Sequence, residues 1–200
     1  MLQALFLIFN FAFLTVSVSP LTDKAPPELA SAVASRLVPA AKVTMGASTL
    51  DIWLVQNLER TADGPGWSNV DSGTLVGAVR VSGEFKEIRG KAVKPGVYTL
   101  RYGLQPQNGD HLGISAFRDF LLLSPAALDK DPKVLGFDGA VALSKEVIGT
   151  AHPASLSLDP PEDAPGAVLS AYKNEHGHDG VVLQIGGLKF GLIVSGLIVH

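Results

Sequence analysis

Two alternating runs of apolar residues flank a pair of glycines near the end of the chain, and they constrain the fold more than any other feature. Val181, Leu183 and Ile185 precede the glycines at 186 and 187, and apolar residues recur at 188, 190, 192 and 194. A period of two places each set on one face of an extended strand. Two glycines between such runs favour a tight primed turn, so the pattern predicts an antiparallel hairpin.

The same alternation recurs upstream, which indicates a fold made of short strands. The chain has 21 Gly and 13 Pro in 200 residues, and these residues favour the turns that separate such strands. The sequence therefore predicts a mainly β protein, an antiparallel β-sandwich with one or two short helices. The expected strands are 50–55, 75–81, 97–104, 120–123 and 167–172, and the expected helices are 28–37 and 139–149.

The N-terminal segment predicts export. Residues 2–18 contain no charged side chain, and the small residues Ser17 and Ser19 follow the apolar run. This pattern is typical of a signal peptide, here residues 1–19, with cleavage near residues 17–20. An uncleaved N-terminal anchor is the alternative, and it would be the chain's only link to a membrane. Either way the rest is expected in an extracytoplasmic space, periplasmic or secreted, as a linker with a short helix (20–38) and a single β-sandwich domain (39–200).

Composition excludes several functional classes. The chain has no Cys, which rules out disulfides and thiolate metal sites. Its net charge is −3 and its basic residues are scattered, so we expect no nucleic-acid partner. The sequence contains no Gly-x-Ser-x-Gly nucleophile motif and no phosphate-binding loop.

The segment 105–117 is long for a hairpin connection and carries the best candidates for a metal site. One hypothesis places zinc or copper on Asp110, His111 and Asp119, joined by His152, because carboxylate and neutral imidazole suit these ions. The alternative is structural: a turn, an exposed histidine, and an ion pair between Arg118 and Asp119. No cofactor is required by any motif.

Two further features suggest binding. His176 and His178 are separated by one glycine, and a pair of histidines at this spacing chelates a metal or simply occupies a polar hairpin loop. Trp67 lies in a Gly- and Pro-rich loop and is the aromatic residue that we expect to be exposed, as a ligand-binding residue. Tyr98 and Tyr102 share an apolar strand face with Leu100, so we expect both in the core.

A Pro-Gly turn followed by Tyr-x-Leu, residues 95–100, resembles an element of transthyretin-like and immunoglobulin-like modules. The runs 98–107 and 118–123 also resemble an uncharacterised family of exported bacterial β-sandwich proteins. The resemblance covers roughly residues 74–125 and implies a fold and a location. It implies no activity and carries over no catalytic residue.

Together these patterns favour a non-enzymatic extracytoplasmic binding or structural module. The expected partner is another protein, or a second copy that pairs through a strand edge. One alternative is a small metal-binding protein or metal-dependent enzyme centred on His111. Another is a carbohydrate-binding module, which requires Trp67 and a second aromatic residue on one exposed face.

Overall fold

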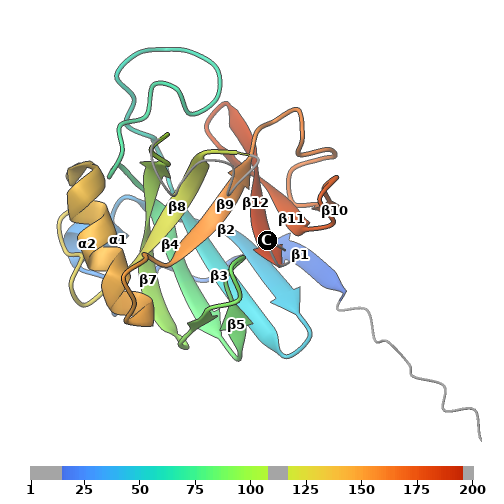
Figure 1. Cartoon of the computed structure of the whole chain (residues 1–200), viewed down its shortest axis with the longest axis horizontal. Helices are drawn as coiled ribbons and strands as arrows, with labels where there is room; N and C mark the ends of the chain where they lie inside the picture. Colours follow the sequence, from blue (N-terminus) through green and yellow to red (C-terminus); the bar gives the residue numbers. More distant parts are fainter. Residues whose placement is uncertain (1–14, 108–116, 196–200) are drawn as a thin grey trace, which may run out of the picture.

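A computed structural model describes residues 15–107 and 117–195, and these residues form a mainly antiparallel β protein (Figure 1). Ten strands make one sheet in the order β1-β2-β3-β4-β7-β8-β9-β12-β11-β10. They are β1 (Val16–Pro20), β2 (Leu37–Met45), β3 (Ser48–Val55), β4 (Leu75–Ser82), β7 (Gly96–Leu104), β8 (Asp119–Pro125), β9 (Ser155–Asp159), β10 (Ala171–Lys173), β11 (Asp179–Ile185) and β12 (Leu188–Ser195). The strands β5 (Phe85–Lys86) and β6 (Ala92–Val93) form a small second sheet.

The large sheet curls into a near-barrel. Its two edge strands, β1 and β10, approach each other, and β2 similarly approaches β11 (Figure 1). The two layers that enclose the core are thus opposite halves of one curled sheet. The prediction of a mainly antiparallel β protein with short helices is confirmed. Self-association through a strand edge stays a prediction.

Period-two alternation places the apolar side chains as the sequence suggests. In β3, Leu50 and Ile52 point into the core, whereas Trp53 lies on the opposite face. The predicted C-terminal hairpin is also confirmed, because Ile185 pairs with Leu188 across the glycine turn. Gly186 has a φ of 54°, which a residue with a side chain adopts only at a cost in free energy.

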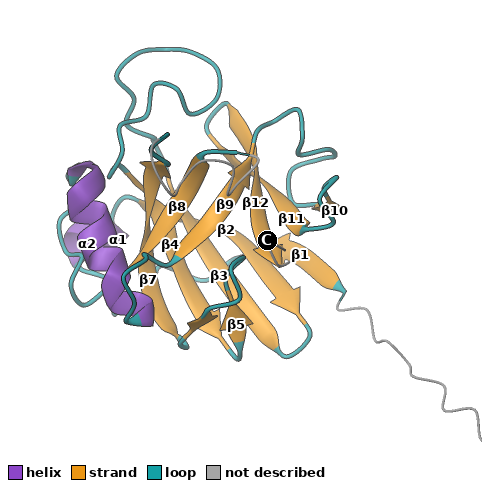
Figure 2. Cartoon of the chain, viewed as in Figure 1, coloured by secondary structure: helices purple, strands orange, loops and turns teal. Residues whose placement is uncertain are grey.

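The sequence predicted the position of one helix more accurately than that of the other (Figure 2). Helix α2 (Gly136–Ile148) covers β8 and lies where a helix was expected. Helix α1 (Ser31–Ala34) is a single turn, shorter than the expected 28–37, because the chain enters β2 at Leu37. No helix in the described ranges is both long enough and apolar enough to span a bilayer.

Residues 16–36 are part of the packed domain. Strand β1 pairs along its whole length with β2, from Val16 opposite Met45 to Pro20 opposite Ala41. The following residues cover the outer face of β3, where the indole N–H of Trp53 donates to the carbonyl oxygen of Asp23 at 2.8 Å. Trp53 has no solvent exposure. The segment expected to link a signal peptide to the domain therefore completes one side of the near-barrel.

A buried ion pair fastens the outer face of the central strand β7. The guanidinium of Arg101 donates two parallel hydrogen bonds to the carboxylate of Asp129, at 2.6 and 2.7 Å, and Thr99 donates a third. Both charged side chains are at most 2% exposed. The remaining guanidinium hydrogens reach the carbonyl oxygens of Gly73, Asp131 and Lys133 at 2.5 to 2.8 Å. All five donors are thus satisfied, as a buried charge requires.

Replacement of Arg101 by Met tests this role. It leaves the Asp129 carboxylate buried without its partner, so we expect the free energy of unfolding to fall by about 3–5 kcal/mol. Urea unfolding measures the loss. The matched control is Arg36→Met, which removes an exposed ion pair with Glu59 and is expected to change stability by less than about 1 kcal/mol. Equal effects of the two replacements would contradict the assignment.

Candidate functional site

Two long connections leave the sheet at the same end. We call this the loop-bearing end, and define it by residues 56–74 and by the described parts of 105–118 (Figure 2). Gly73 donates its N–H to the carbonyl oxygen of Tyr102 at 2.8 Å, and Leu104 donates to the hydroxyl of Ser72 at 3.2 Å. The first connection therefore runs beside the end of β7.

Trp67 closes the near-barrel at this end. Its ring is stacked on Tyr102, with centroids 5.2 Å apart, and meets Phe190 edge to face at 5.1 Å. Only 4% of the residue is exposed, so the prediction that Trp67 forms an exposed platform for a ligand is wrong. The reason is that its loop folds back over the open end of the core, where a large aromatic ring gains most from burial.

The indole nitrogen of Trp67 is an unsatisfied donor. It is buried, and it has no hydrogen-bond acceptor among the described residues. A donor left unpaired inside a protein reduces stability by about 1–3 kcal/mol. The ring is held in place by its aromatic contacts and not by its polar atom.

Tyr102 joins Trp67 to Asp119. The hydroxyl of Tyr102 donates to Oδ1 of Asp119 at 2.5 Å, and Asp119 is the first residue of β8. Burial raises the pKa of Tyr102 well above its usual range, and the hydrogen bond to Asp119 and its negative charge add to the rise. The phenol stays protonated at neutral pH, so this pair positions the carboxylate and does not transfer a proton.

The neighbouring Arg118 fastens the base of the β7–β8 connection. Its Nε and Nη2 atoms donate to the carbonyl oxygen of Gln105 at 2.8 and 2.7 Å, and the N–H of Gln105 donates to the carbonyl oxygen of Arg118 at 2.8 Å. The expected ion pair between Arg118 and Asp119 is replaced by these contacts. Asp119 is held by Tyr102 on β7, and Arg118 binds Gln105 just beyond the end of that strand.

The structure describes two of the four proposed metal ligands, Asp119 and His152. Asp110 and His111 lie outside the described residues. Asp119 and His152 lie at opposite ends of the β8–β9 pair, because Leu122 pairs with Ser155 and the two strands are antiparallel. At about 3.3 Å per residue their backbones are roughly 20 Å apart, so the expectation that they share a metal is wrong.

Within the described ranges, no group of three or more His, Cys, Asp or Glu side chains is arranged to hold a metal ion. His152 lies in an exposed turn in which the Thr150 hydroxyl donates to its carbonyl oxygen at 2.9 Å. Asp119 is the one predicted ligand that the structure places at the loop-bearing end.

A buried carboxylate outside the predicted zinc or copper set, that of Asp159, lies on the outer face of the same end. Asp159 is 2% exposed, and its Oδ2 atom accepts hydrogen bonds from the Tyr172 hydroxyl at 2.9 Å and the Asn174 amide at 3.1 Å. Burial raises the pKa of Asp159, and the two hydrogen bonds act in the opposite direction. A buried carboxyl with a raised pKa is a recognised mark of a functional site, although structural networks show it too.

Two glycines make room for this contact. A Cβ atom on Gly180 or Gly191 would collide with the Tyr172 side chain, which crosses β11 and β12 to reach Asp159. Isolated glycines inside alternating strands often mark such a close approach. They are the one sequence signal that could have drawn attention to Tyr172.

The Asp159 network yields a pH prediction. Because the folded-state pKa is raised, the stability that this group contributes is present below its ordinary pKa of 3.8 and is lost as pH rises through the folded value. Asp159→Asn keeps an oxygen acceptor for both donors but cannot ionise. Its stability relative to the wild type should therefore increase from about pH 4 to pH 7. Urea unfolding across that range measures the difference, with the exposed Asp71→Asn as control. A relative stability that decreases with pH would refute the assignment.

Comparison with known proteins adds no assignment to these residues. No family model, no curated protein and no solved structure matches the chain. The resemblance to transthyretin-like and immunoglobulin-like modules stays a prediction, and both clusters rest on geometry alone.

Proposed function

We propose that the protein is a non-enzymatic extracytoplasmic binding module, and that its loop-bearing end recognises a partner protein. The observation that carries the proposal is the way in which two long connections are held on a rigid sheet. Loops presented by such a scaffold are the usual place for recognition, because the sheet fixes their bases while their tips vary.

The contacts at the loop bases support this function. Trp67 anchors the first connection through its stack on Tyr102, and the second is anchored where Arg118 holds Gln105. Tyr102 also holds the carboxylate of Asp119, next to Arg118, so Tyr102 contacts the bases of both connections. Fixed loop bases reduce the conformational entropy that is lost when such a surface binds a partner.

The polar chemistry of the described residues favours binding over catalysis. Asp119, Asp159 and Asp129 all hold other parts of the protein, through hydrogen bonds with Tyr102, Tyr172 and Thr99 respectively. Each of these carboxylates accepts a hydrogen bond from a side chain of another element, and two of them, Asp129 and Asp159, are buried. Such groups are suited to fixing a surface and poorly suited to moving protons.

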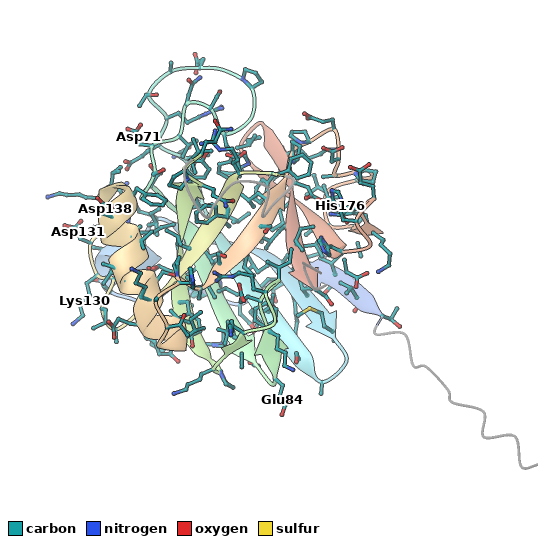
Figure 3. All side chains as sticks on the ribbon, in the orientation of Figure 1. Asp71, Glu84, Lys130, Asp131, Asp138 and His176 are labelled. Carbon is teal, nitrogen blue, oxygen red and sulfur yellow. The ribbon has the colours of Figure 1, made fainter. Side chains whose placement is uncertain are left out.

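Site-specific photo-cross-linking in the producing cell tests the proposal. A photoreactive amino acid at the exposed Asp71 lies at the loop-bearing end, and one at the exposed Glu84 lies at the other end of the sheet (Figure 3). We expect a single cross-linked partner from position 71 and none of that mass from position 84. The product should decrease when Asp119→Ala loosens the base of the β7–β8 connection.

The same adduct from both positions, or from position 84 alone, would overturn the proposal. An adduct with the mass of two copies of the chain would identify self-association as the function of this end. Because both positions carry an exposed acidic side chain in the native protein, the two replacements change the surface charge equally.

Export of the chain is the second part of the proposal, and the structure sharpens the expected processing. Cleavage near residues 17–20 would cut through β1, whose Val16 and Val18 pack against the core. If the N-terminal segment is removed, we expect the cut before Val16. Intact mass and N-terminal sequencing of the exported protein measure the new terminus, and a mature chain that begins at residue 18 or 20 would contradict this expectation.

A further inference from the structure

The loop between β10 and β11 holds two histidines close together at the surface. The ring centroids of His176 and His178 are 6.1 Å apart, and the side chain of His176 is 42% exposed (Figure 3). Gly177 lies between them with a φ of 78°, a conformation that turns the chain sharply. The two rings belong to one short turn, in which His176 is exposed and His178 is partly buried.

A hydrogen-bond network anchored in the protein interior fixes this turn. The Oδ1 atom of Asn174 accepts the backbone N–H groups of His176 and His178 at 3.1 and 3.0 Å. The Nδ2 atom of the same Asn174 donates to the buried carboxylate of Asp159, which also holds Tyr172. A surface loop is thus tied through one amide to a buried charge.

The side chain of Asn174 connects the shape of this turn to the buried carboxylate of Asp159. A buried carboxylate reduces stability unless it is well hydrogen-bonded, and here one of its two bonds goes to the residue that shapes the histidine turn. Supporting hydrogen bonds of this kind, one step behind the ligands, are what orient imidazoles in protein metal sites.

The separation of the rings suits one metal ion. A zinc or copper ion lies about 2.0–2.1 Å from each ligating imidazole nitrogen, so two ring centres that share an ion are roughly 5–6 Å apart. The observed 6.1 Å is close to the upper end of that range. Glu175, whose Oε1 atom is 3.5 Å from Nε2 of His176, adds negative charge beside the pair.

We propose that His176 and His178 form a two-histidine chelate for a divalent transition metal, with Cu²⁺ bound more tightly than Zn²⁺, and that Asn174 is its positioning residue. The preference follows from the general order of affinities of nitrogen ligands for first-row metals. Two protein ligands leave the other coordination positions to solvent or to an external ligand. This site is in the β10–β11 loop, outside residues 56–74 and 105–118, and does not depend on the proposed binding function.

Titration of the full chain with Cu²⁺ and with Zn²⁺ in a non-coordinating buffer tests the site. We expect saturable binding of one ion, with an electron paramagnetic resonance spectrum of the copper form that shows two nitrogen ligands. His176→Ala and His178→Ala should each weaken copper binding at least tenfold, whereas His152→Ala, which removes an exposed histidine in another turn, should leave it unchanged. Both target histidines are in a surface turn, so these variants are expected to fold.

Asn174→Ala separates positioning from simple stability. It keeps both imidazoles but removes the acceptor of their backbone N–H groups, so we expect weaker binding together with a changed copper spectrum. A variant that lowers the melting temperature but leaves the spectrum unchanged would assign Asn174 to stability alone. Copper affinity that is unchanged in either histidine variant, or wild-type protein without saturable binding, would overturn the proposal.

Discussion

The buried pair of Arg101 and Asp129 is the interaction on which most of the structure depends. Arg101 projects from the outer face of β7, in the middle of the sheet, and its five donors gather three carbonyl oxygens and one carboxylate. Most of these contacts hold the connection that follows β8. This connection leads directly into α2, which covers β8 and β7. Because a charge without its partner is strongly unfavourable in the interior, this network selects one path for the chain over the sheet.

At the loop-bearing end, two hydrogen bonds between a tyrosine and an aspartate likewise hold separate segments of the chain together. Tyr102 holds Asp119 on the core side of the sheet, and Tyr172 holds Asp159 on the outer side. In each pair a phenol whose pKa is raised by burial donates to a carboxylate near the end of a strand. The polar groups thereby fix the bases of loops, which connects the stability of the sheet to the binding surfaces proposed for the loops.

The candidate site was only partly predictable. The length of the segment 105–117 drew attention to Asp119, because a long connection on a sheet stands out in any sequence. The predicted exposure of Trp67 was wrong. A Gly- and Pro-rich loop is usually exposed, whereas this loop folds over the open end of the core. His152 was grouped with Asp119 by residue type, but strand register separates them. Tyr172 was missed because its partner lies on a strand with which β10 forms no pairing.

By itself the sequence determined the local features: alternating strands, the Gly186-Gly187 turn, a helix near residues 139–149 and a chain free of disulfides. These follow from interactions between residues close in the chain, which leave a direct pattern. Tertiary structure alone decided that the sheet curls until β1 meets β10, that Arg101 is buried, and that Trp67 closes the near-barrel. These outcomes depend on twist accumulated over ten strands and on contacts between distant segments, and no local period of the sequence encodes them.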